Sequence, residues 1–416
     1  MTALGALIGL ILSIVLIIRR IPPVYSLMLG ALAGGLLGGF SLSETVTFML
    51  EGVKDITPAV LRILAAGVLS GVLVKTGAAA SISNTIVNTL NERHTYLALA
   101  LATMLLTAIG VFIDVAVITV APIALGLGQR LKIPKGTLLL IMIGGGKCGN
   151  IISPNPNTIV AAENFHADLS SVMVANILPA IIGLFFVSYL LVRFMPKKGV
   201  LIGENDISSR EEKLPSFASS MAAPVVTILL LSLRPICNVV IDPMIALPAG
   251  GIAGIIATRR WERFRESMSY GLEKMSFVAI LLIGTGTIAG IIKASTIKDV
   301  LLDVLSRTHM GEVLIAPVSG ALMSAATAST TAGSTVASSS FAETILAAGI
   351  SGVWGAAMIN AGATILDHLP HGSFYHATGG SVNMSFGERL KLIPYETIIG
   401  FVLTALSVGT YFVFGK

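Results

Sequence analysis

Charged residues are scarce in this sequence. Asp, Glu, Lys and Arg make up 12% of its 416 residues, whereas an average soluble domain has about 25%. This scarcity excludes an ordinary soluble enzyme. Hydrophobic residues account for 54% of the chain, the mean hydropathy is +0.88, and 43 glycines are spread over the whole length. The composition is typical of an all-α polytopic membrane protein, in which small residues let helices pack closely.

Cysteines are few and common enzyme motifs are missing. The two cysteines, Cys148 and Cys237, lie within or close to apolar stretches, which excludes a disulfide scaffold and a cysteine-based metal cluster. The sequence contains neither H-E-x-x-H nor G-x-S-x-G, and it has no Walker A motif for ATP hydrolysis. We therefore expect no enzyme activity, no cofactor and no metal site.

The formal net charge is +5 and the pI is about 9.2. The basic residues lie mainly in short segments between apolar runs, so they indicate membrane topology and not a nucleic-acid partner. If the N-terminus is external, most of the 27 Lys and Arg residues fall on the inner side of the membrane. The charge distribution thus predicts that both termini lie outside the cell.

Five apolar runs in each half of the chain are long enough to cross roughly 30 Å of hydrocarbon. They lie near residues 2–18, 24–41, 57–74, 136–165 and 169–193, and near residues 219–234, 243–258, 276–292, 350–383 and 394–415. The first run has no basic segment before it and no cleavage site, so we expect it to be retained as a span. A polar stretch, residues 196–215, separates the halves and is expected to be a cytoplasmic linker.

Two further apolar stretches, residues 95–128 and 312–349, are each interrupted near the middle. The interruptions fall near residues 110–114 and 327–335. The arms on either side have about 15 residues each, too few to span a membrane at about 1.5 Å per residue. We expect two re-entrant hairpins, one in each half.

The two halves repeat each other at a shift of about 216 to 220 residues. Among the matching landmarks, Gly52 corresponds to Gly271, Gly67 corresponds to Gly286, and Pro154 corresponds to Pro370. An odd number of crossings in each half turns the second copy upside down. The predicted fold is therefore two inverted repeats, residues 1–195 and 216–416, each with five transmembrane helices and one re-entrant hairpin.

Polar interruptions at membrane depth indicate where a solute binds, because exposed backbone is tolerated there only when it lines a cavity or is buried in protein. The prolines of Ser153-Pro-Asn-Pro-Asn-Thr158 should break the fourth span of the first half, and residues 367–373 should break its counterpart. Helix ends at such breaks attract ions, and hydroxyl and amide groups can bind a solute. The candidate substrate-binding residues are Lys147, Asn150, Ser153, Asn155, Asn157, Thr158, Ser329, Thr330, Ser334, Thr335 and Ser373.

Ionisable residues inside spans are costly and therefore candidates for function. Asp114, Asp367, His368 and His371 are candidate ion-coupling residues. Since a histidine titrates near physiological pH, these two histidines could carry a proton. The alternative is that they form structural hydrogen bonds at a helix break. Lys147 either neutralises a substrate carboxylate or pairs with Asp114 or Asp367.

Several of these segments resemble the gluconate permease family of organic-anion carriers. The similar segments are residues 110–125, Ser153–Thr158 with the following Ile-Val-Ala-Ala, Ser334-Thr-Val-Ala337, and His368 with the nearby Gly372-Ser-Phe374. The resemblance implies a scaffold that forms a homodimer. It also implies a mobile domain of hairpins and broken helices that moves like an elevator.

The expected function is secondary active symport of a small organic anion, such as a sugar acid or hydroxy acid, driven by protons across the inner (plasma) membrane. The expected partners are this anion, a proton or sodium ion, membrane lipid and a second copy of the chain. A sodium-coupled carrier or a sodium/proton antiporter is the alternative within the same class, since antiporters also use broken helices and buried carboxylates. A channel and an intramembrane enzyme are less consistent with closed hairpins and with the missing motifs.

Overall fold

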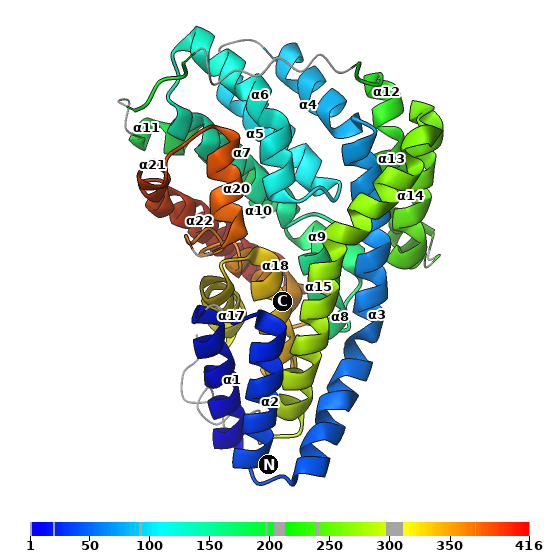
Figure 1. The fold of residues 1–416 in the computed structure, drawn as a ribbon, viewed down its shortest axis with the longest axis vertical. Coiled ribbons are helices and arrows are strands. Elements are labelled where there is room, and N and C mark those ends of the chain that lie inside the picture. The colour runs from blue at the N-terminus through cyan, green and yellow to red at the C-terminus, as the bar shows by residue number, and fades with distance from the viewer. Residues whose placement is uncertain are drawn as a thin grey trace.

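The protein is a bundle of helices in its computed structural model (Figure 1). The structure describes residues 2–19, 21–90, 94–195, 199–203, 213–237, 239, 241–296, 311–370 and 372–415, and this part of the chain contains helices but no strand. The first half contains α1 (Ala3–Ile18), α2 (Pro23–Leu37), α3 (Leu42–Lys75), α4 (Ala78–Thr89), α5 (Thr95–Ala108), α6 (Ile113–Leu131), α7 (Lys135–Asn150), α8 (Pro156–Asn164), α9 (Leu169–Ala175), α10 (Ile177–Phe185), η2 (Phe186–Leu191) and α11 (Val192–Phe194).

The second half follows a similar order of long, short and paired helices. It contains α12 (Phe217–Ser220), α13 (Ala222–Cys237), α14 (Pro243–Thr258), η4 (Trp261–Arg263), α15 (Phe264–Lys293), α17 (Gly311–Thr327), α18 (Thr330–Ala347), α19 (Gly352–Gly362), α20 (Ser373–Ser381), α21 (Phe386–Leu390) and α22 (Ile393–Phe414).

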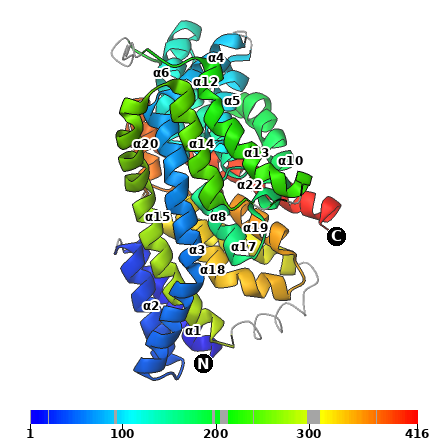
Figure 2. The same cartoon turned by 90° about the vertical axis from the view of Figure 1, so that its right-hand side faces the viewer.

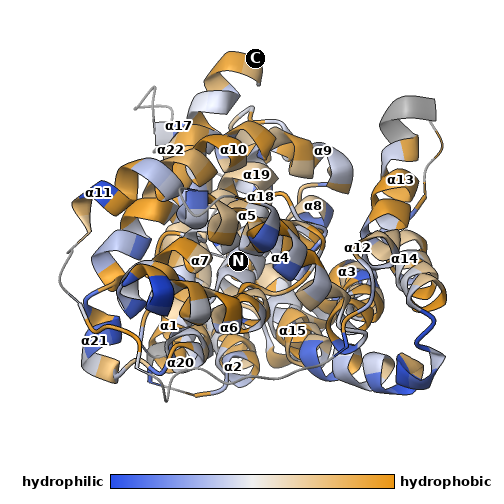
Figure 3. Ribbon diagram, turned by 90° about the horizontal axis from the view of Figure 1, so that it is seen from above, coloured by the Kyte–Doolittle hydropathy of each residue, from blue (hydrophilic) through white to orange (hydrophobic). Residues whose placement is uncertain are grey.

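The length and composition of the helices are those of a membrane protein. Five described segments are long and apolar enough to cross a bilayer: Leu42–Lys75, Ile113–Leu131, Leu169–Phe194, Trp261–Lys293 and Phe386–Phe414. Large apolar side chains such as Leu50, Phe277 and Phe401 are more than half exposed on the protein surface, as lipid contact requires. Figure 3 shows hydrophobic residues dominating peripheral helices such as α10 and α13.

Two helices extend well beyond the apolar runs seen in the sequence. α3 begins at Leu42 instead of near residue 57, and α15 begins at Phe264 instead of near residue 276. The early start of α3 has a local cause, because Ser41 and Glu44 form a reciprocal capping box at its N-terminus. Hydropathy therefore found the apolar part of each helix and missed the polar turns before it. It also missed the short helix α4.

α3 and α15 run antiparallel and side by side along most of the length of the molecule (Figure 2). Their backbones approach closely, because Gly67 faces Gly271 and Gly52 faces Gly286: a Cβ atom added to Gly52 would lie only 2.1 Å from the carbonyl oxygen of Gly286. Glycine permits this approach. The pair α1–α2 packs against α15, and the pair α13–α14 packs against α3. We call α3 and α15, together with these two pairs, the framework.

The two interrupted stretches form helical hairpins. α5 and α6 are joined by residues 109–112, where Gly110 has a φ of +101°. α17 and α18 are joined by Ala328 and Ser329 alone, so the expected opening over residues 327–335 is shorter than predicted. Ser329 caps the first turn of α18 through the Ala332 amide, and this cap lets residues 330–335 remain helical despite their Ser and Thr content.

The two predicted helix breaks are present. The first break, residues 151–155, separates α7 from α8, and the second break, residues 363–372, separates α19 from α20. The glycines before the first break are helical and serve packing: a Cβ atom on Gly145 would lie 2.0 Å from the Ala100 carbonyl oxygen of α5. The breaks and both hairpins lie together on one side of α3 and α15, where α8 and α19 both pack against α18.

Candidate functional site

Lys147 lies at the centre of the candidate site, in the last turn of α7, and its side chain is fully buried. Its Nζ atom is 2.6 Å from the carbonyl oxygen of Thr364, 2.6 Å from Asp367 Oδ1 and 3.1 Å from His368 Nδ1. All three partners belong to the second break. Lys147 therefore pairs with Asp367 and not with Asp114, and in this conformation its three donors are committed within the protein.

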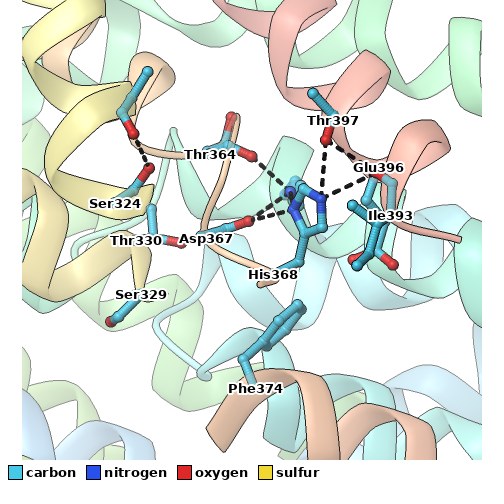
Figure 4. Close-up of polar contacts among 12 residues, drawn as sticks. Ser324, Ser329, Thr330, Thr364, Asp367, His368, Phe374, Ile393, Glu396 and Thr397 are labelled. Atoms are coloured by element: carbon cyan, nitrogen blue, oxygen red, sulfur yellow. Dashed lines mark hydrogen bonds and ion pairs between the residues drawn. The ribbon is translucent and has the colours of Figure 1, made fainter. Parts of the chain in front are cut away.

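Asp367 and His368 continue this contact in two directions (Figure 4). Thr330 donates a hydrogen bond of 2.6 Å to Asp367 Oδ2. On the other side, His368 Nε2 lies 3.1 Å from both the Ile393 carbonyl oxygen and Thr397 Oγ1. A carbonyl oxygen can only accept, so Nε2 donates to the Ile393 carbonyl oxygen. Nδ1 lies 3.1 Å from both Lys147 Nζ and Asp367 Oδ1. His368 thus links the second break to α22.

A cavity of about 350 Å³ opens beside Asp367. The first turns of three helices line it: residues 112–114 of α6, residues 329–332 of α18, and residues 373–374 of α20. Asn150 and one side of α15 complete its wall. We call it the break cavity. Free N–H groups at the start of a helix favour an anion, and three of the four predicted interruptions place a helix start at this space. The carboxyl groups of Asp114, Glu273 and Asp367 line it as well.

The amides of the first break bind mainly to the protein itself. Asn155 Oδ1 accepts from the backbone and hydroxyl of Thr158, at 3.1 and 3.0 Å. Asn157 Nδ2 donates to Asn360 Oδ1 at 2.6 Å, and Asn360 Nδ2 donates to Thr158 Oγ1 at 2.9 Å. These bonds close the break and tie α8 to α19. Asn155, Asn157 and Thr158 therefore have partners without a solute.

Four of the candidate residues have a buried polar atom without a hydrogen-bond partner among the described residues. Asn150 Nδ2, Ser153 Oγ, Ser334 Oγ and Thr335 Oγ1 are buried and have no hydrogen-bond partner in the described part of the chain. Asn150 is 5% exposed and the other three are fully buried. A buried polar atom without a partner costs about 1–3 kcal/mol, so these atoms are available to water or to a solute.

The remaining candidates divide between the break cavity and the residues that the structure does not describe. Asp114, Ser329 and Ser373 line the break cavity, and Asp114 has no hydrogen bond or ion pair among the described residues. His371 lies outside the described residues.

Sequence reasoning missed several polar residues around the site. Asn360 was overlooked although it is a single amide in the otherwise apolar helix α19, which is a usable signal. Arg62 was not among the candidate residues although it is a charged residue within an apolar run; it binds Asp242 and Glu163. Thr364 contributes a backbone oxygen to Lys147, and Thr397 contributes a hydroxyl to His368. Neither contact can be recognised from the sequence.

A second, larger cavity of about 520 Å³ meets α18 further along the helix. Residues 338–340 of α18 and Asn164 of α8 line it, and Asn164 donates to the hydroxyls of Ser338 and Ser339 at 2.9 and 3.1 Å. We call it the serine cavity. Ser334 and Thr335 are fully buried and lie on α18 between the residues that line the two cavities.

The chain is similar in sequence to known permeases and transporters. The model of the GntP family permeases matches residues 1–249, and a model of the Na+-H+ antiporter family matches residues 219–309. An uncharacterized transporter of Haemophilus influenzae is 53% identical over 99% of both chains. A high-affinity gluconate transporter of Escherichia coli is 22% identical over 94% of this chain and 95% of its own length.

A further transporter and a solved structure also match most of the chain. The D-serine transporter DsdX of Escherichia coli is 22% identical over 76% of this chain and 78% of its own length. The crystal structure of the Alcanivorax borkumensis YdaH transporter, at 14% identity, superposes with a TM-score of 0.64 over 90% of this chain and 89% of that one. That structure has the same overall fold. With a family model over more than half of its length and a relative that matches it almost from end to end, the chain belongs to the GntP family of permeases.

Proposed function

We propose that this protein is a secondary active symporter that carries a small organic anion, such as a sugar acid or hydroxy acid, across the inner membrane. The observation that carries the proposal is the break cavity, on which the first turns of α6, α18 and α20 open. Helix N-termini bind carboxylates, and the nearby unpartnered donors suit a hydroxylated solute. Relatives named for gluconate and D-serine transport agree with a small carboxylate-bearing solute.

The two halves are proposed to be inverted repeats, residues 1–195 and 216–416, joined by a linker at residues 196–215. The contacts between α3 and α15 support this. In sequence, Gly52 matches Gly271 and Gly67 matches Gly286, whereas in space Gly52 meets Gly286 and Gly67 meets Gly271. Two copies related by a two-fold axis exchange partners in this way.

Transport is proposed to proceed by alternating access, with an elevator-like movement of the hairpins and broken helices against the framework. The break cavity and the serine cavity meet α18 at different points along its length, and Ser334 and Thr335 lie buried between those points. A solute can therefore be exposed to one cavity at a time. The proposal includes a homodimeric framework and termini outside the cell, as the family resemblance and the charge distribution predict.

The coupling ion is proposed to be a proton that exchanges at the cluster of Lys147, Asp367 and His368. The cluster is buried and hydrogen-bonded to both sides of the second break, so a change in its protonation changes contacts between α7, α18 and α22. The match of residues 219–309 to a sodium/proton antiporter family favours a sodium-dependent carrier or an antiporter as the second candidate.

Uptake by proteoliposomes tests the proposal. We expect the purified protein to accumulate a radiolabelled organic acid when the outside is more acidic than the lumen, and to lose accumulation when the proton gradient is collapsed. Accumulation that follows an imposed sodium gradient instead would favour the second candidate. Binding and uptake of none of the carboxylates in a broad panel would contradict organic-anion transport itself.

A further inference from the structure

Arg62 lies near the middle of α3, where a charged side chain is costly in a membrane helix. Its side chain is surrounded by two carboxylates. Nε and one terminal nitrogen bind Asp242, at distances of 2.8–3.2 Å, and the other terminal nitrogen binds Glu163. The transport site described above uses none of these three residues.

The two carboxylates belong to different parts of the molecule. Asp242 caps the N-terminus of α14 by accepting from the Met244 amide at 2.8 Å, and α14 packs along α3. The Arg62–Asp242 pair is therefore internal to the framework. The helix α8 follows the first break directly, and Glu163 lies in its last turn. α8 packs against α18 and α19. The Arg62–Glu163 pair thus connects the framework to the broken helix.

This arrangement lets the Arg62–Glu163 pair open while the Arg62–Asp242 pair stays closed. If α8 moves away, Asp242 still compensates the Arg62 charge through two guanidinium nitrogens. Glu163 is about one quarter exposed and lines two cavities: the serine cavity, with Asp55, Lys293 and Glu343, and a smaller one of about 210 Å³, with Asp168 and Asp242. A separated Glu163 carboxylate is thus not left in a dry interior, where an unpaired charge costs several kcal/mol.

We propose that the Arg62–Glu163 ion pair is a releasable contact that positions α8, and with it the first break, against the framework during transport. Glu163 acts as a positioning residue: closing the pair favours the conformation described here, and opening it favours the other conformation. The inference rests on the proposed function, because it assigns the pair to the movement between the two conformations of a carrier.

The charge arrangement provides a matched pair of variants. Glu163→Gln and Asp242→Asn each remove one carboxylate from Arg62 and replace it with an amide of the same shape. Only the first weakens the contact between framework and broken helix. In the full-length protein, Glu163→Gln should change the KM for uptake at least threefold with a separate change in Vmax. Asp242→Asn removes the carboxylate that compensates Arg62 after Glu163 separates, so it should shift the KM in the opposite direction. Glu163→Asp, which keeps the charge, should restore part of the wild-type KM.

A second measurement does not depend on uptake. Ser339→Cys places a thiol at the serine cavity, and its rate of labelling by a maleimide reports how often that cavity is open. We expect Glu163→Gln to change this rate at least threefold and Asp242→Asn to change it in the opposite direction. Equal rates and equal KM values in the two variants would overturn the inference. Wild-type protein that takes up no organic acid would contradict the proposed function, while the labelling comparison would still decide the role of the ion pair.

Discussion

Gly67 of α3 and Gly271 of α15 face each other so closely that a Cβ atom added to Gly271 would lie 2.0 Å from the Gly67 carbonyl oxygen. Gly52 and Gly286 repeat this contact further along the same two helices. The pair of α3 and α15 is thus held by backbone packing at several points along its length, and the breaks and hairpins are arranged beside it.

Gly271→Ala should therefore destabilise the protein by about 1–3 kcal/mol, because the added methyl group forces the two backbones apart. Gly126→Ala is the matched control, since a Cβ atom at Gly126 of α6 meets nothing within 4 Å. The unfolding midpoint of both variants, measured in the same detergent, checks this. Equal midpoints would show that α3 and α15 are not in close contact.

The ion pair of Lys147 and Asp367 gives a second prediction. Lys147→Met should lower the stability by about 3–5 kcal/mol, because it leaves the Asp367 carboxylate buried without its cation. The double variant Lys147→Met with Asp367→Asn should recover a substantial part of that loss. A double-mutant cycle on unfolding free energies measures the coupling. Strictly additive losses would contradict a direct pair.

Thr335 provides a test of the solute site. Its buried hydroxyl lacks a partner among the described residues, so Thr335→Val should weaken solute binding about threefold to tenfold without lowering stability. Thr227→Val is the control, because Thr227 Oγ1 is also buried and unpartnered but lies at the contact of α13 with Gly250 of α14. Ligand-induced shifts in melting temperature give both affinities. Unchanged affinity in the Thr335 variant would remove this residue from the site.

Asp242 predicts a pH dependence. The hydrogen bonds from Arg62 hold the pKa of the Asp242 carboxyl below its usual range. A depressed pKa stabilises the folded protein at pH values above the unfolded pKa, near 4, and this stabilisation disappears as the pH falls through the folded pKa. The melting-temperature difference between wild type and Asp242→Asn should be constant from pH 5 to 7 and shrink below about pH 4.

The exposed Glu262, which precedes α15, supplies the control for that experiment. Glu262→Gln should show no comparable change between pH 3 and 7. A wild-type advantage over Asp242→Asn that persists undiminished at pH 3 would argue against the ionised pair with Arg62.

Features with a local physical cause could be predicted from the sequence. The prolines at 154 and 156 remove backbone donors and exclude helical geometry before them, and the first break lies at residues 151–155. The Ser and Thr content of residues 330–335 predicted a longer opening than the structure has, because a single cap by Ser329 keeps these residues helical. Hydropathy also failed to predict the polar start of α3. The capping box that begins this helix is a short-range feature that does not depend on apolar content.

Long-range pairing could not be predicted. Lys147 and Asp367 are 220 residues apart, and the sequence offered Asp114 as an equally good partner. The two partners of Arg62 are 101 and 180 residues away. Only the folded arrangement of α7, α8 and α14 around the long helices decides these pairs, whereas the residue types needed for a polar site were already visible.

The pairing of Lys147 with Asp367 has an electrical consequence for the proposed elevator movement. The positive charge of Lys147 and the negative charge of Asp367 cancel, so this pair would cross the field of an energised membrane without electrical work. Each unpaired elementary charge would cost or yield about 2.3 kcal/mol per 100 mV. In the proposed mechanism, the voltage across the cell membrane therefore acts mainly through charges outside this pair.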